Sequence, residues 1–568
     1  MFTDELIAEL SLAVSHELVS VARYLSDLPG DKTHLVLEVV RYVDRAFLSS
    51  LGRRDRETVD EHFSSLMTKY GYCPTLQSLL PLTTGSAVFG LTVSSPESKQ
   101  WAGTVLTQVG RARFLQHLID LTRSGILDVS QGIRTINFTR SREDYGVEIL
   151  EHLERGRLED LRLRILGEDS ISPVREPPNL AQAMYDSVFV WRDHYIGYEA
   201  TPEVDDYFVC EVGRNFVEWA DLAGIHPSFS FGLVTAADLM HVALAMASLH
   251  QKHVRFCLEY IRKFDDKDLS NILTIWTEKQ KLIEAISSRV GLSRFTVHQC
   301  LTLLAVTAGN IAEHANRTTP ACPSLIEVTR RLWIRPAHSG FTNPLLFAAR
   351  ELQQHKRKVW DKNVRKREWW FRHDLYALFQ GDRFARVDES RQLRESNRVI
   401  TDIDAAILDR ETGTLALFEL KWQEAFGDHE PERRSKAKNL NAEVQKWVKS
   451  VEAFLEIQGG KEIARQIGFS EDEASAIDDV KLFVIARFHA RFSGFAVEHA
   501  SAAVASWQQF TRVRLGCGSV VNIFALLFDE IRREQREPVA AVWNSISFRV
   551  GQREITVEEA FSQGPIVS

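Results

Sequence analysis

Paired cysteines, long apolar runs and an excess of positive charge are all missing from this sequence. The cysteines are scattered and none belongs to a CxxC pair, which argues against a zinc site or a disulfide framework and is typical of a reducing cytosol. We therefore expect them to be free core thiols. The six cysteines are Cys73, Cys210, Cys257, Cys300, Cys322 and Cys517.

The lack of long apolar runs bears on whether the protein is secreted or inserted into a membrane. The N-terminal stretch MFTDELIAELSLAVSHELVSVARYL has acids near its start and helical apolar spacing, unlike a secretory signal. The most apolar interior stretch, LVTAADLMHVALAMASLH, is interrupted by Asp238 and His241, so it is too polar for a membrane span. We therefore expect a cytoplasmic protein that has no membrane partner. Its net charge of −8 means that any surface for nucleic acid must be a local patch.

What is present predicts a mixed fold. A chain of 568 residues is too long for one core, so two to four domains are expected. Apolar residues recur at helical spacing through most of the first 345 positions, which predicts a large all-α N-terminal part. The proline-containing stretch GEDSISPVREPPNL divides it into regions 1–170 and 171–345. After the boundary stretch 319–344, helices and strands alternate, which predicts an α/β domain over 346–568.

One stretch of the second region, residues 282–304, has the spacing of a helix-turn-helix. Ser287 is small, Gly291 suits the turn, Ser293 is placed to cap a second helix, and Val297 and Leu301 would face inward. Its second helix offers few donors for phosphates or bases, namely Arg294, Thr296, His298 and Gln299. A purely structural helical hairpin is favoured over a nucleic-acid contact, and both interpretations stay open.

Two local basic patches follow. The stretch from Lys356 to Arg372 holds eight basic residues against two acids, and the loop expected at 431–439 carries Arg433, Arg434, Lys436 and Lys438. Either patch could follow a phosphate backbone, or be a solvated face or a surface loop. The eight basic residues of the first patch are Lys356, Arg357, Lys358, Lys362, Arg365, Lys366, Arg367 and Arg372.

The stretch 401–422, TDIDAAILDRETGTLALFELKW, combines two apolar runs with charged residues. The nearly continuous apolar runs predict strands buried on both faces, joined by a turn at Gly413. Charges on such strands are costly unless they pair or hold a cation. Asp404 on the first strand and Glu419 on the second can converge if the strands pair, with Lys421 on the same face as Glu419. Carboxylate oxygens in this arrangement suit Mg²⁺ or Mn²⁺.

These residues resemble the motif of the PD-(D/E)xK nuclease superfamily. Residues 346–500 present the family's element order, with Asp404 as the strand Asp and Glu419 and Lys421 as its E-x-K. The family's proline is absent, since Ile403 precedes Asp404. The resemblance implies a restriction-endonuclease-like fold with a central mixed sheet, covering the C-terminal domain only.

The resemblance also implies roles for particular residues. Asp404 and Glu419 would hold Mg²⁺ or Mn²⁺ together with the Leu420 carbonyl, and Lys421 would position or activate water. Glu368 in KREWWF takes the place of the family's helix Glu, as an optional ligand for a second ion, and Gln445 falls where some members have a Gln. Asp402 is the weaker alternative to Asp404, as an acid behind the ligand.

The function that follows is a metal-dependent endonuclease acting on nucleic acid, most simply DNA, in restriction, defence against mobile elements or repair. The N-terminal helical part would recognise something, which leaves open a homo-oligomer or a protein partner. The alternative is a non-catalytic nucleic-acid-binding or scaffold protein that retains a nuclease-like core. An RNA substrate is a third possibility.

Overall fold

The computed structural model describes residues 2–29, 32–51, 59–83, 92–132, 135–140, 176–265, 267–317, 322–396, 398–422, 430–490, 501–518, 520–534 and 543–560. No described helix is long and apolar enough to cross a membrane. All six cysteines are free, and four of them are buried; Cys210 is exposed and Cys322 is partly exposed.

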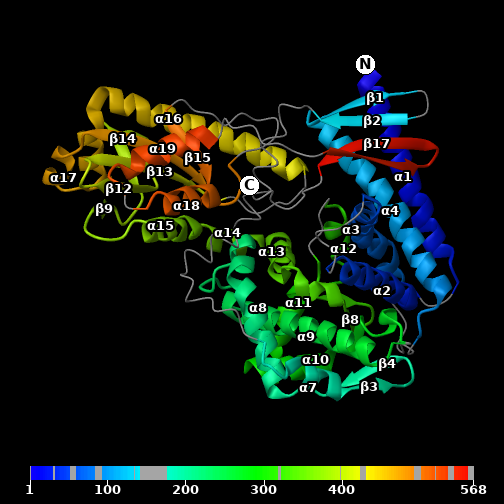
Figure 1. Cartoon of the computed structure of the whole chain (residues 1–568). Coiled ribbons are helices and arrows are strands. Elements are labelled where there is room, and N and C mark those ends of the chain that lie inside the picture. Colours follow the sequence, from blue (N-terminus) through cyan, green and yellow to red (C-terminus); the bar gives the residue numbers. More distant parts are fainter. Residues whose placement is uncertain are drawn as a thin grey trace.

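The first region is a group of long helices with a sheet at one end (Figure 1). Its helices bury apolar faces against one another, as the helical spacing predicted. The elements are α1 (Phe2–Asp27), α2 (Lys32–Leu51), α3 (Val59–Leu79), η1 (Leu80–Leu82), α4 (Pro96–Arg123), β1 (Leu127–Gln131) and β2 (Thr135–Arg140). Residues 141–170 of this region lie outside the described part of the chain.

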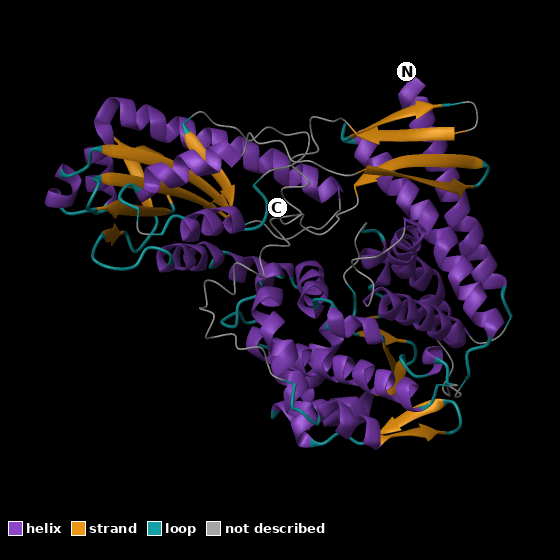
Figure 2. Ribbon diagram, viewed as in Figure 1, coloured by secondary structure: helices purple, strands orange, loops and turns teal. Residues whose placement is uncertain are grey.

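The sheet of the first region is completed by the far end of the chain. The C-terminal hairpin of β16 (Trp543–Val550) and β17 (Arg553–Ala560) pairs with β2, with β17 parallel to it, in the order β1-β2-β17-β16 (Figure 2). This hairpin belongs to the stretch 346–568 that the sequence assigned to one α/β domain, but it lies with the first region.

The second region mixes helices with short strands. Together with β1 and β2 of the first region, these strands show that the expectation of an all-α N-terminal part is wrong. The sequence did not reveal them because strands of two to six residues are too short to interrupt the helical spacing visibly. Its sheets have the orders β3-β4 and β5-β8-β7-β6. The elements are α7 (Leu180–Ser187), β3 (Val188–Trp191), β4 (Tyr195–Tyr198), α8 (Pro202–Leu222), α9 (Ala236–Lys263), η3 (Leu269–Asn271), β5 (Ile275–Glu278), α10 (Lys279–Val290), α11 (Arg294–Leu303), β6 (Ala305–Val306), α12 (Ile311–Ala315), β7 (Leu325–Glu327), β8 (Leu332–Arg335) and η4 (Ala337–Phe341).

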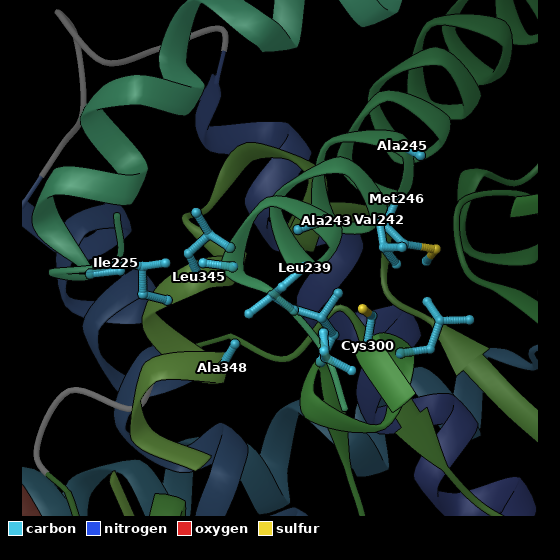
Figure 3. Packing of buried hydrophobic residues seen from close by; sticks show 14 of the residues in the cluster. Ile225, Leu239, Val242, Ala243, Ala245, Met246, Cys300, Leu345 and Ala348 are labelled. Carbon is cyan, nitrogen blue, oxygen red and sulfur yellow. The ribbon is translucent and has the colours of Figure 1, made fainter. Parts of the chain in front are cut away.

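A hydrophobic cluster of this region extends past the boundary that the sequence predicted. Leu239, Val242 and Met246 of α9 pack with Cys300 of α11 and Leu345 of α13 (Pro344–His355) (Figure 3). Helix α13 spans the expected boundary at 345, and its apolar face belongs to the core of the second region. The boundary stretch itself holds β7 and β8. Helical spacing shows that α13 has a face to bury, but not which partner buries it.

The third region contains a five-stranded mixed sheet, which lies between two helical layers (Figures 1 and 2). Its strand order is β15-β14-β13-β12-β9, parallel between β13, β14 and β15 and antiparallel elsewhere. Helix α16 packs on one face, and α15, α18 and α19 pack on the other. The elements are α14 (Arg357–Val364), α15 (Arg367–Ala377), β9 (Phe384–Arg386), β10 (Arg391–Glu395), β11 (Arg398–Ile403), β12 (Ala405–Asp409), β13 (Thr414–Lys421), α16 (Glu430–Ile467), α17 (Glu471–Ser475), β14 (Asp479–Ala486), β15 (Ala502–Ser506), α18 (Trp507–Gly516) and α19 (Ile523–Glu534).

The central strands agree with the sequence prediction, with one difference. Strands β12 and β13 are buried on both faces, and Gly413 takes a positive φ of 63° in the turn between them. The first strand of the stretch 401–422 does not run on through Asp404: the strand breaks there, because β11 leaves the sheet to pair with β10.

Candidate metal and catalytic site

Asp404 lies at this break, where its backbone and its side chain both hold on to β13. Its backbone N–H donates to the Phe418 carbonyl at 3.2 Å, and its Oδ2 accepts from the Leu420 N–H at 2.8 Å. The regular pairing of β12 with β13 ends at Ala405 and Phe418. Beyond this last pair, the Asp404 carboxylate accepts the hydrogen bond of the Leu420 N–H in place of a backbone carbonyl. This contact fixes the carboxylate beside the C-terminal end of β13.

Glu419 and Lys421 share the sheet face that α16 covers. Leu415 and Leu417, at alternate positions before them, pack in the cluster beneath α16, whereas Ala416 and Phe418 pack on the opposite face. Side chains two apart on a strand point to the same face. Ala406 and Leu408 of β12 lie on the α16 face too, so Asp404 belongs to the same set.

Lys421 bridges two carboxylates. Its Nζ lies 2.7 Å from Oε1 of Glu419 and 2.9 Å from Oε2 of Glu443 on α16. Burial acts to lower the pKa of Lys421, but the charges and hydrogen bonds of Glu419 and Glu443 outweigh it and raise that pKa. Lys421 is therefore an ammonium ion at neutral pH.

The two buried carboxylates are held in an unfavourable environment for negative charge. Burial, followed by the charge of Asp404, raises the pKa of Glu419 to about 8. Burial also raises the pKa of Asp404, against the opposing effects of the Leu420 N–H, Lys421 and Arg372. Asp404 and Glu419 are 9% and 8% exposed, so solvent screens them little. A further cation, in addition to Lys421, would relieve this cost.

The Leu420 carbonyl is also placed for such a cation. In a β-ladder the N–H and C=O of one residue point to the same side of the strand. Because the Leu420 N–H meets Asp404, its carbonyl points to the Asp404 side too, beyond the last regular pair of the ladder. The three positions that the sequence proposed for a metal are thus brought together.

Glu368 lies near this group without joining it closely. It is exposed in the first turn of α15, and its pKa is raised by partial loss of solvent around its carboxyl and then by the charge of Asp404. Among the described residues, the one group of three acidic or His side chains with ligand atoms within 4.8 Å of one another lies elsewhere, at Glu313, Glu351 and His355. The structure does not place Glu368 as tightly as a shared ligand of Asp404 and Glu419 requires.

Gln445 is not part of the group. It is exposed on α16 and its Nε2 donates to Oδ1 of Asn441 at 3.3 Å. Val444 between the two flanking positions is buried, and the flank that faces Lys421 is that of Glu443. The sequence pointed to the correct helix but to Gln445 instead of Glu443. Sequence position does not show which flank of a helix will face Lys421.

Arg372 is, after Glu443, the second residue that supports the site and that the sequence did not reveal. It was counted with the basic patch, but it is buried, and its Nε donates to the Asp404 carbonyl while its Nη1 donates to the Asp388 carbonyl at 3.3 Å. It thereby fixes the chain at the break. Arg372 lies one position after Phe371 and three before Leu375, both of which are buried. This spacing was the signal in the sequence that the Arg372 side chain is buried too.

The first basic patch is divided by the fold. Arg367 is buried like Arg372, and its guanidinium donates to the Gly224 carbonyl of the second region at 2.8 Å. These two arginines are therefore structural and do not belong to a phosphate-binding face. The exposed members on α14 and its C-terminal end are Arg357, Lys358, Lys362, Arg365 and Lys366.

The second basic patch is not a loop. Residues 431–439 form the start of α16, and Nη1 of Arg434 donates to the Arg123 carbonyl of the first region at 3.2 Å. Lys438 is exposed, and the side chain of Arg433 lies outside the described part of the chain.

The group of Glu313, Glu351 and His355 has a simpler explanation than a metal. Glu351 is buried and accepts from Nε2 of His314 at 2.8 Å. His355 lies 3.5 Å from Glu313 on the surface. Hydrogen bonds and close polar contacts among these four side chains account for their proximity.

Comparison of the chain with protein-family models, with curated proteins and with solved structures finds no match. The function of this chain is therefore inferred from the geometry of Asp404, Glu419 and Lys421, called the Asp404 group below.

Proposed function

We propose that the third region is a metal-dependent phosphodiesterase, a nuclease whose site is formed by Asp404, Glu419 and Lys421. The observation that carries the proposal is the convergence of these three side chains at one end of β13, where Asp404 is bound to the Leu420 N–H and Lys421 to Glu419. The resemblance of this motif and of the mixed sheet to the PD-(D/E)xK superfamily supports the same function.

The donor set fits a hard divalent cation. Asp404 and Glu419 would hold Mg²⁺ or Mn²⁺ with the Leu420 carbonyl, and Mg²⁺ commonly uses one or two carboxylates and completes its shell with water and substrate phosphate. Bound there, the ion would supply positive charge to the phosphate under attack. The raised pKa of Glu419 supports this assignment, since the buried acids are poorly compensated by Lys421 alone.

Lys421 has a defined part in this chemistry. Hydrolysis joins a water oxygen to phosphorus as a P–O ester bond breaks, and negative charge gathers on the phosphate oxygens. The raised pKa of Lys421 makes it a donor that orients water and stabilises that charge, rather than a base that removes a proton. Glu443 positions the ammonium through its 2.9 Å contact.

The test compares two similar triplets on neighbouring strands. Asp479 and Lys481 on β14 form a D-x-K ion pair of 3.1 Å at the opposite end of the sheet and serve as a matched control. We expect Lys421→Ala to lower Mg²⁺-dependent cleavage of the folded protein by at least about a hundredfold, as for loss of a donor to the transition state. Lys481→Ala should leave cleavage unchanged.

The assay should offer supercoiled plasmid, linear duplex, single strands and RNA, with and without Mg²⁺. Glu419→Ala should abolish cleavage and weaken Mn²⁺ binding, whereas Lys421→Ala should abolish cleavage and keep the metal. Absence of Mg²⁺-dependent cleavage of every substrate by the unmodified protein would refute the proposal.

The second candidate is a nucleic-acid-binding or scaffold protein with a non-catalytic core. The observation in its favour is that Lys421 already pairs with both Glu419 and Glu443 in an ion-pair network. In that case no variant should change Mg²⁺-dependent cleavage, and Glu419→Ala should lower stability because Lys421 loses one of its two carboxylate partners. Cleavage by the unmodified protein, compared with the melting curves of the variants, therefore separates the two candidates.

A further inference from the structure

The helix pair of residues 282–304 has the geometry of a helix-turn-helix. Gly291 ends α10 with a positive φ of 69°, and the Ser293 hydroxyl caps α11 by accepting from the Thr296 N–H at 3.1 Å. Val297 and Leu301 of α11 are fully buried. The sequence prediction of this local structure is confirmed, and the remaining question is what the outer face of α11 does.

The structure adds a feature that the sequence did not reveal. Strands β7 and β8 form an antiparallel hairpin, and β5, which leads directly into α10, pairs with β8. Strand β6, which follows α11, pairs with β7. Both helices are thus tied to one sheet, and that sheet carries a hairpin loop, residues 328–331, beside the helix pair. Figure 1 shows α10, α11 and β8 in the same lower part of the molecule.

The hairpin loop is anchored to the start of α10. The Lys279 N–H donates to the Arg331 carbonyl at 2.9 Å, and Nζ of Lys279 lies 2.5 Å from Oε2 of Glu327. The Thr329 hydroxyl accepts from the Leu332 N–H at 3.1 Å and closes the turn. The loop therefore has a fixed position relative to the helices.

The loop presents two adjacent positive charges. Arg330 and Arg331 are exposed, and neither side chain forms an ion pair with any described residue. Two adjacent arginines held at a tight turn concentrate positive charge beside the helix pair, on a chain whose net charge is −8. Such charge is suited to phosphate oxygens.

The outer face of α11 is free of negative charge. Its sequence, RFTVHQCLTL, contains no acid, and the exposed residues Arg294, His298 and Thr302 recur every four positions along one face. Phe295 beside them is 56% exposed. Arg294 pairs with Glu284 at 2.9 Å, but both side chains are about half exposed or more, and such surface pairs are weak.

We propose that α11 and the loop 328–331 together form a binding surface for double-stranded DNA, with α11 in the major groove and Arg330 and Arg331 on the flanking phosphates. The major groove of B-form DNA admits an α-helix, whereas that of A-form RNA is too narrow. The surface is separate from the Asp404 group. The proposal builds on the proposed function, since the bound duplex would be the substrate of that group, but binding is measured without cleavage.

The experiment uses the full chain in EDTA, so that no divalent cation supports cleavage, and measures fluorescence anisotropy with duplex DNA, duplex RNA of the same sequence and single-stranded DNA. Arg330→Gln with Arg331→Gln should weaken duplex DNA binding by roughly tenfold and reduce the salt dependence by about two counterions, the number expected for two phosphate contacts. Arg294→Ala with His298→Ala should weaken duplex DNA binding and leave single-strand binding unchanged.

The control is Arg532→Gln with Arg533→Gln in the last turn of α19, which removes the same charge from another region. It should bind duplex DNA like the unmodified protein. Equal losses in the hairpin variant and the control, unchanged affinity in the hairpin variant, or duplex RNA bound as tightly as duplex DNA would each overturn the proposal. Duplex DNA binding that depends on Arg330 and Arg331 without any Mg²⁺-dependent cleavage would support this surface and refute the nuclease.

Discussion

At the scale of single residues, Glu443 is the acid that the fold adds to the E-x-K motif. Its carboxylate reaches Lys421 from α16, although Glu443 itself is largely exposed. Asp404, Glu419 and Lys421 come from a hairpin, so the strands alone leave the position of the Lys421 ammonium open. The contact with a separate helix restricts it, and this is how supporting residues orient a reactive group.

The structure predicts different outcomes for substitution of two nearby residues on α16, Glu443 and Gln445. Glu443→Gln should reduce the cleavage rate by about ten- to a hundredfold, the range for loss of a supporting contact, with metal affinity unchanged. Gln445→Ala should keep the rate within about twofold, because it contacts Asn441 and not the site. The rates are compared in single-turnover assays at saturating Mg²⁺. A larger effect at Gln445 would favour the family-based assignment over the geometry.

At the scale of elements, α14 carries the exposed part of the first basic patch. Its exposed lysines and arginines lie on the side away from Trp360 and Asn363, which are buried. The helix packs on the same hydrophobic cluster as α11, through Trp360 and Val359. A basic helix anchored in this way is suited to follow a phosphate backbone without reading bases.

Replacing Arg357, Lys358 and Lys362 together by Gln should weaken binding to all DNA sequences alike. The salt dependence of binding should fall by up to about three counterions, about one for each lost phosphate contact. Titrations of two unrelated duplexes at several salt concentrations check this. If neither affinity nor salt dependence changes, α14 is a solvated face.

A matched comparison is available in the same stretch. Arg367→Gln should lower the melting temperature, because its guanidinium is buried against the Gly224 carbonyl and stacks over Trp360. The triple variant of α14 should melt like the unmodified protein, since its three side chains are exposed.

At the scale of the whole molecule, a buried ion pair joins the first two regions. Asp44 of α2 accepts from Nδ1 of His338 at 2.6 Å and from the Thr274 hydroxyl at 2.6 Å. Both Asp44 and His338 are almost completely buried. Removing one partner would leave a buried charge without compensation, so Asp44→Ala should destabilise the protein by about 3 to 5 kcal/mol.

The same pair predicts a pH dependence. Burial acts to lower the pKa of His338, but the hydrogen bond and charge of Asp44 and the contact with Cys322 outweigh it, raising that pKa from 6.5 to about 10. The folded protein therefore holds a proton that the unfolded chain releases between these values. The stabilisation is complete below about pH 6.5 and is lost as the pH rises towards about 10.

Melting temperatures of the unmodified protein and of His338→Gln, measured across this range, test the prediction. The advantage of the unmodified protein should shrink as the pH rises. An advantage that stays constant would show that His338 contributes by packing and not by charge.

The sequence by itself determined several local structures and which charged residues lie on the buried strands. Alternation and continuity of apolar residues defined β12, the turn at Gly413 and β13, because a strand buried on both faces must be apolar along its length. The charged exceptions, Asp404, Glu419 and Lys421, were visible for the same reason. Helix capping at Ser293 and the turn at Gly291 were also local, since both depend on residues within one turn.

Only the tertiary structure decided which elements meet. Strand β17 completes the sheet of β2 across more than four hundred residues, α13 packs into the region before it, and α16 presents Glu443 rather than Gln445 to Lys421. Apolar spacing specifies that a face is buried but not what buries it, because hydrophobic burial is not directional. Packing also decides the environment of individual basic residues. Arg372 is buried and donates to the Asp404 carbonyl, whereas Arg330 is exposed at the surface.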